Sequence, residues 1–267
     1  MNDEFYIGWQ NQAPPGIGSH VRKVVVGLLL LVLVLALILP LAQRTIGVAV
    51  FEWGTLKTFT GVLVARPYPH LLVTRPGQGG SRSAYYLVAP FKFGLKPETV
   101  ARLDGQSVTL KGTLIYRDTQ TMIEAQPDSI KLSSPQPGTR VEKGADPEIE
   151  KPGSNIGNPV TLVGEIVDSK CYLGVMNPGR LTPHRACAVR CISGGIPPIL
   201  LVRRENGLPL YFLLVSSDGR PVNQQVLDMV AEPVQITGEV VRQGEWSILR
   251  ADPATYRPVS DERRGPR

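Results

Sequence analysis

The sequence predicts a mainly β protein in which one membrane-spanning helix precedes two small tandem barrels. Three observations support this prediction: an uncharged apolar run near the N-terminus, two blocks of short strand-like segments, and a register match between those blocks. The composition agrees, because 27 glycines and 24 prolines in 267 residues favour short strands with tight turns over a helix bundle.

The apolar run predicts a transmembrane helix over residues 24–43. Residues 24–42 are nineteen positions without a charge, which is long enough to cross a bilayer as a helix. A cleaved signal peptide is the competing interpretation. It is disfavoured because 23 residues precede the run and because Pro40-Leu41-Ala42 is a poor cleavage site.

Basic residues flank both ends of the run, with Arg22 and Lys23 on one side and Arg44 on the other, so the positive-inside signal is weak. We expect the short segment 1–23 to be cytoplasmic and the C-terminal part to be exported. A bacterial inner membrane, crossed once, with the large C-terminal part in the periplasm fits this arrangement. The lipid bilayer and a membrane protein complex are the expected partners.

Residues 51–132 form the first predicted domain. The strand-like and helix-like segments follow one another in the order β-β-β-α-β-β, which is the order of an OB-fold, a partly open five-stranded barrel. The expected strands cover 57–66, 70–74, 83–89, 108–117 and 121–125, with a short helix over 97–103.

A stretch rich in Pro, Gly and charge, residues 133–158, predicts a linker because it cannot bury a core. A second OB-like domain is expected over 159–258, followed by a disordered tail over 259–267. Its expected strands cover 160–168, 199–204, 208–216, 234–242 and 245–251, with a helix over 223–231.

The two blocks match in register. Gly112 aligns with Gly238 at an offset of 126 residues, and no gap is needed over more than forty residues. The first strands align at a shorter offset of 103, from Gly61 to Gly164. The second block therefore contains about 23 extra residues between its first and third strands. They belong to an insertion, residues 168–198, in a loop that OB-folds use to bind ligands.

The insertion holds all three cysteines and a histidine: Cys171, His184, Cys187 and Cys191. Thr182 is a suitable N-cap for a helix over 183–192, and on that helix the last three of these residues share one face. Cys171 ends the preceding strand and would complete a Cys3His set. Such a set suits zinc, and soft thiolates also suit Cu(I). We predict these four residues as metal ligands.

Two alternatives remain open for the same residues. Cys171 could form a disulfide with Cys187 or Cys191 and staple the insertion to the barrel, which would give a structural subunit without metal. A thiol-redox factor using Cys187 and Cys191 is the other alternative, since nearby arginines and a helix N-terminus favour thiolates.

Several functions lack support in the sequence. There is no Gly-rich phosphate loop and no GxSxG elbow, so we expect a non-catalytic role. The net charge of +6 forms no basic face with interleaved aromatics, so we expect no nucleic acid partner. Glu165 and Asp168 are interpreted as a solvated strand edge. The overall prediction is a membrane-anchored periplasmic protein that binds metal or acts as an accessory to a membrane complex.

Overall fold

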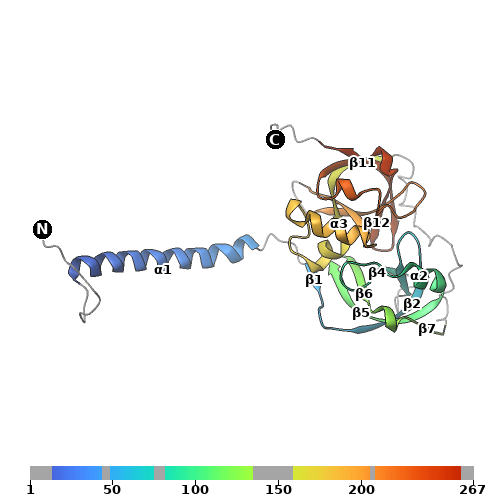
Figure 1. Cartoon of the computed structure of the whole chain (residues 1–267), viewed down its shortest axis with the longest axis horizontal. Coiled ribbons are helices and arrows are strands. Elements are labelled where there is room, and N and C mark those ends of the chain that lie inside the picture. Colours follow the sequence, from blue (N-terminus) through green and yellow to red (C-terminus); the bar gives the residue numbers. More distant parts are fainter. Residues whose placement is uncertain (1–13, 44–48, 75–81, 135–158, 205–207, 260–267) are drawn as a thin grey trace. The chain divides into compact units, whose positions relative to one another are not determined.

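The computed structural model describes residues 14–43, 49–74, 82–134, 159–204 and 208–259 (Figure 1). The chain forms two compact units, Met1–Gly47 and Val48–Arg267, which we treat separately. Most of the predicted linker and nearly all of the predicted tail, like most of segment 1–23, lie outside the described residues.

The first unit contains a single helix, α1, over Pro15–Gln43. Its segment Pro15–Leu41 is long and apolar enough to cross a membrane, and it is the one such helix in the described part of the chain. The helix begins earlier than the predicted 24–43 because Pro15 can occupy the first helical position. Pro40 lies near its end.

The second unit is built from two closed five-stranded barrels, as predicted. In the first, the strands follow the closed path β2-β3-β4-β6-β5-β2, with β4 and β6 parallel. The short α2 helix, Pro97–Leu103, connects β4 to β5. Two short strands, β1 and β7, pair with β5. The strands cover Ala49–Phe51 (β1), Lys57–Val64 (β2), His70–Thr74 (β3), Arg82–Val88 (β4), Ser107–Arg117 (β5), Gln120–Ala125 (β6) and Lys131–Leu132 (β7).

The second barrel repeats this connectivity as β8-β9-β10-β12-β11-β8, with β10 and β12 parallel and β13 added beside β11. Its strands cover Val160–Asp168 (β8), Pro198–Val202 (β9), Leu210–Val215 (β10), Pro233–Gln243 (β11), Trp246–Arg250 (β12) and Arg257–Pro258 (β13). The aligned glycines Gly112 and Gly238 leave no room for a side chain, because each packs against a neighbouring strand.

The predicted helix over 223–231 is wrong, since only Leu227–Met229 forms a single 3₁₀ turn. The apolar residues there do face the core, and Val222, Val226 and Val230 are all buried. Tertiary contacts determine the backbone here instead of helical hydrogen bonds. The side-chain amide of Asn223 donates to the carbonyls of Ile192 and Ile196.

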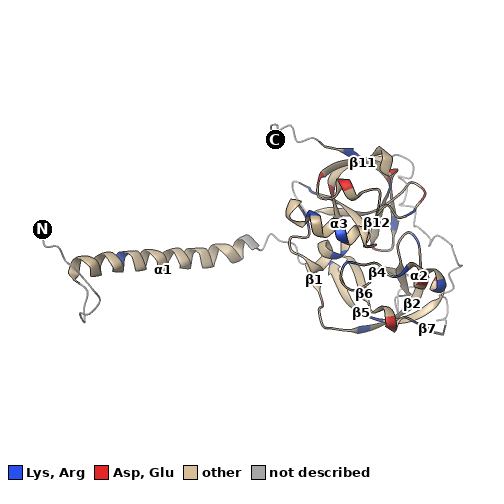
Figure 2. Cartoon of the chain, in the orientation of Figure 1, with Lys and Arg blue, Asp and Glu red and all other residues tan. Residues whose placement is uncertain are grey.

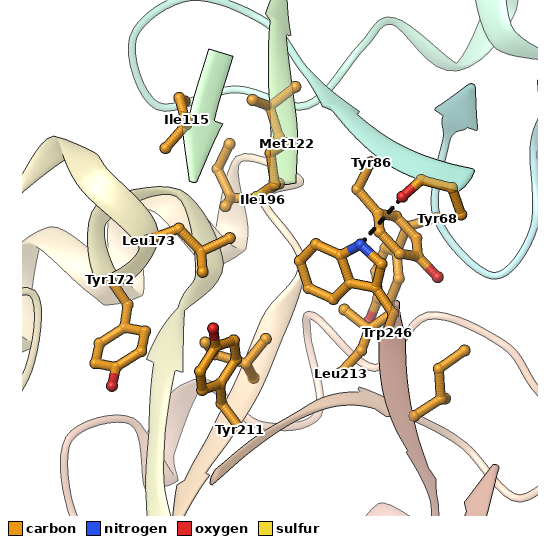
Figure 3. Packing of buried hydrophobic residues seen from close by; sticks show 14 of the residues in the cluster. Tyr68, Tyr86, Ile115, Met122, Tyr172, Leu173, Ile196, Tyr211, Leu213 and Trp246 are labelled. Atoms are coloured by element: carbon orange, nitrogen blue, oxygen red, sulfur yellow. Dashed lines mark hydrogen bonds between the residues drawn. The ribbon is translucent and has the colours of Figure 1, made fainter. Parts of the chain in front are cut away.

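The two barrels share one hydrophobic core in addition to the core inside each barrel. Tyr86 of β4 and Trp246 of β12 meet edge to face, with ring centroids 4.7 Å apart. The indole Nε1 of Trp246 donates to the carbonyl of Ala84 at 3.2 Å (Figure 3). These contacts make the barrels parts of one compact body.

A buried polar chain crosses the same interface. His70 of β3 is fully buried, and its Nδ1 donates to the carbonyl of Tyr68 at 2.9 Å. Its Nε2 accepts from the amide of Gln243 in β11 at 3.0 Å, and the oxygen of that amide accepts from the Tyr86 hydroxyl. This pairing fixes a neutral imidazole, and burial lowers the pKa of His70 to about 4.

The pKa of His70 predicts a loss of stability in mild acid. The unfolded histidine titrates near pH 6.5, so between about pH 6.5 and 4 the unfolded chain binds the extra proton. The free energy of unfolding should therefore fall by up to about 3 kcal/mol as the pH drops through this window. Urea unfolding of the full chain in detergent, followed by tryptophan fluorescence, measures it.

Two variants isolate this effect. His70→Gln should lower the stability at pH 7.5 and should lose less of it between pH 6.5 and 4. Tyr86→Phe removes a hydroxyl from the same chain and should keep the wild-type slope. Equal slopes in wild type and His70→Gln would refute the assignment.

Candidate metal centre

The insertion folds into three short helical pieces between β8 and β9. A π-helical turn covers Cys171–Val175, a 3₁₀ turn covers Thr182–His184, and the helix α3 covers Arg185–Ser193. Thr182 lies inside the 3₁₀ turn and makes no capping bond, so the predicted helix start is too early. The helix is followed by Gly195 in the left-handed conformation, which commonly ends helices.

The structure brings the three cysteine sulfurs close together. Cys171, Cys187 and Cys191 place their sulfur atoms within 4.8 Å of one another. Cys171 and Cys191 are buried, and Cys187 is half-buried. All three are free thiols, and the sulfurs of Cys171 and Cys187 are 4.0 Å apart. A disulfide requires about 2.05 Å, so the structure does not contain the disulfide of the alternative interpretation.

The predicted fourth ligand, His184, lies in an adjoining group formed with Asp168 and Cys171. Its Nε2 is 3.0 Å from Oδ2 of Asp168, and both side chains are buried. The other carboxylate oxygen of Asp168 accepts from the backbone N–H of Cys171 at 2.8 Å. Asp168 therefore positions both a cysteine and the histidine.

The interpretation of Glu165 and Asp168 as a solvated strand edge is wrong. The insertion folds back over the end of β8, so Asp168 is fully buried. Glu165 is also buried, and it accepts from the backbone N–H of Leu181. A periodic strand pattern shows which residues point outward from the sheet, but not which of them a later loop covers.

A lysine of the first barrel contacts the sulfurs. The Nζ of Lys92, in the loop between β4 and α2, is 2.7 Å from Sγ of Cys187 and 4.0 Å from Sγ of Cys191. The hydrogen bond to Cys187 raises the pKa of Lys92, so the side chain stays an ammonium. The helix α3 carries basic residues (Figure 2), and two of the arginines expected to favour thiolates, Arg185 and Arg190, belong to it. Arg185 is instead paired with Glu232.

The thiols differ in acidity. Cys171 donates a hydrogen bond to Cys191, and this bond, aided by the nearby Lys92 ammonium, lowers the pKa of Cys191. The same bond, together with burial, raises the pKa of Cys171. The cluster therefore contains one thiol whose pKa is lowered and one whose pKa is raised.

The loop that carries Lys92 is held against the insertion by a buried lysine. Lys170, next to Cys171, is 2% exposed, and its Nζ donates to the carbonyls of Ala89 and Phe91 at 2.9 and 2.7 Å. The same ammonium pairs with Glu124 of β6 at 2.5 Å. A backbone bond from Gly94 to Gly194 closes the contact at 2.9 Å.

Sequence reasoning therefore found the three cysteines and the histidine but missed Asp168, Lys92 and Lys170. Asp168 and Lys170 lie just before Cys171 in the sequence, and this proximity was the only local indication that they belong to the site. Nothing in the sequence near Lys92 indicates a contact with residues almost a hundred positions later.

Comparison with known proteins adds two structural neighbours. No family model and no curated protein matches this chain. The single-stranded DNA binding protein from Thermus aquaticus matches as a deletion mutant and as the wild type, each at 13% identity and a TM-score of 0.24. The matches cover 81% and 83% of this chain and 90% of each neighbour.

These neighbours correct one expectation. Both bear the name of a single-stranded DNA binding protein, so the exclusion of nucleic acid as a partner does not stand and is withdrawn. DNA binding is stated of those proteins, and a likeness at a TM-score of 0.24 assigns no ligand to this chain. The OB-fold assignment is independent of them, since it follows from the strand connectivity.

The Lys170 contacts predict a large effect of its removal. Lys170→Met should lower the free energy of unfolding by about 3 kcal/mol, because it leaves the partly buried Glu124 carboxylate, which is 13% exposed, without its partner. Chemical unfolding of the full chain measures this loss. The double variant Lys170→Met/Glu124→Leu should recover part of it, because no unpaired charge remains. A loss below 1 kcal/mol in the single variant would contradict a stabilising role for this ion pair.

Proposed function

We propose that this protein is a membrane-anchored metal-binding protein whose second barrel holds one zinc or copper ion. The ligands would be Cys171, Cys187, Cys191 and His184. One observation carries the proposal: three free sulfurs lie within 4.8 Å of one another, and those of Cys171 and Cys187 are 4.0 Å apart. Thiolates around a tetrahedral zinc, at Zn–S of about 2.3 Å, lie about 3.8 Å apart.

The pairing of His184 supports its inclusion. A carboxylate only accepts hydrogen bonds, so the bond to Asp168 places the proton of a neutral His184 on Nε2. Nδ1 then carries the lone pair that a metal requires. A carboxylate that orients a histidine in this way is the usual outer support of a metal-bound imidazole.

The helix α1 supports the location. It would anchor the chain in a bacterial inner membrane, with residues 1–23 in the cytoplasm and both barrels in the periplasm. In that position the metal centre would serve a membrane protein complex as an accessory subunit. The role would be non-catalytic.

A thiol-redox factor is the second candidate, and a specific contact favours it. The Lys92 ammonium lies 2.7 Å from the sulfur of the half-buried Cys187, and reactive cysteines are found in such electropositive, partly exposed places. In this case Cys187 and Cys191 would be the reacting pair. The disulfide-stapled subunit draws no support from the sulfur distances.

Metal content and thiol counts, measured on the same sample, test the proposal. The full chain, purified in detergent without chelator, should contain one equivalent of zinc or copper and three thiols that react only after a chelator is added. Serine at any of the three cysteine positions should abolish retention of the metal. Asp168→Asn should weaken affinity by about 10- to 100-fold, because it disturbs the orientation of His184.

Ser193→Ala is the matched control, since Ser193 is an exposed residue of the same helix, and it should retain the metal. Absence of metal together with a reversible Cys187–Cys191 disulfide would contradict the proposal in favour of the redox factor. Absence of metal together with a Cys171 disulfide and one free thiol would contradict it in favour of the staple.

A further inference from the structure

The cysteine cluster lies at the interface between the barrels, and the cation that contacts it comes from the barrel without cysteines. Lys92 is 2.7 Å from the Cys187 sulfur and 4.0 Å from the Cys191 sulfur. Cys171 and Cys191 are 4% and 1% exposed, so water screens their charge poorly. Any net charge on a metal complex in this place therefore has to be balanced by protein groups.

Lys92 is held in place. The carbonyl of Phe91 accepts from the buried Lys170, and the backbone N–H of Gly94 donates to Gly194. Phe91 adopts a left-handed backbone with φ of 60°, an uncommon conformation for a bulky residue that these contacts sustain. A side chain at Gly194 would collide with the carbonyl of Lys92. These contacts hold the backbone on both sides of Lys92, and its half-buried side chain extends from there to the Cys187 sulfur.

The charge of the complex depends on the ion. Three thiolates around a divalent ion such as zinc leave one net negative charge, and around a monovalent ion such as Cu(I) they leave two. The attraction between an ammonium at a fixed distance and the complex is proportional to that net charge. Lys92 therefore stabilises the monovalent complex about twice as strongly, in free energy, as the divalent complex.

We propose that Lys92 is the outer counter-ion of the metal centre and that it shifts the preference of the centre toward a soft monovalent ion, Cu(I), relative to zinc. This inference rests on the proposed function of the cysteine cluster. It also makes the centre a joint product of both barrels, because the first barrel supplies the charge that the thiolates of the second barrel require.

His184 shifts the preference in the opposite direction. A tetrahedral divalent ion needs a fourth ligand, whereas soft Cu(I) is satisfied by thiolates. Loss of His184 should therefore weaken zinc binding more than Cu(I) binding. The two residues give opposite signatures, so a general loss of folding cannot imitate both.

The experiment measures the affinities of the full chain in detergent for Cu(I) and for Zn(II), by competition with chromophoric chelators under reducing, oxygen-free conditions. Lys92→Met should lower Cu(I) affinity by about 10-fold more than zinc affinity, since the Cu(I) complex carries one more negative charge for the ammonium to stabilise. Lys92→Arg keeps the charge and should recover most of the Cu(I) affinity. His184→Ala should show the reverse order of losses.

Lys96→Met is the matched control, because Lys96 is an exposed lysine four residues away, and both affinities should stay at the wild-type value. The inference is overturned if wild type binds both ions and Lys92→Met leaves the ratio of the two affinities unchanged or lowers zinc affinity more. The proposed function itself fails if wild type binds neither ion, which is a different result.

Discussion

The ion pair between the buried Lys170 and the partly buried Glu124 is the interaction on which the rest of the site depends. Lys170 precedes Cys171, so the point at which its ammonium is held fixes where the insertion leaves β8. The same ammonium satisfies two carbonyls of the loop that carries Lys92. A buried ammonium without partners would be costly, and the partners of Lys170 all belong to the first barrel. The ammonium is therefore satisfied only when the two barrels are docked. The geometry of the cysteine cluster therefore depends on the docking of the two barrels.

The two barrels share one fold but have different roles. Both barrels have the same strand connectivity, and both have a glycine where the long strand passes close to a neighbour. The second barrel carries the cysteines in an insertion that replaces a short turn. The first barrel keeps the short turn and contributes the surface against which the insertion packs. The hydrophobic core around Tyr86 and Trp246, which both barrels share, holds the two barrels together.

The sequence was sufficient for what depends on local pattern and internal repetition. The barrels, the insertion and the meeting of three cysteines follow from strand alternation, from aligned glycines and from spacing. The burial of Asp168 could not be predicted, because it depends on a later loop covering the end of a strand. Lys92 could not be predicted either, since its contact joins two barrels. The helix expected over 223–231 failed because contacts with Ile192 and Ile196 override its apolar spacing.

The central claim is that the three sulfurs are the first ligands of a metal ion. X-ray absorption at the zinc edge of the zinc-loaded full chain tests it most directly. The account predicts three sulfur neighbours at about 2.3 Å and one nitrogen at about 2.0 Å. A shell of oxygen and nitrogen with no sulfur, or with only one, would contradict it.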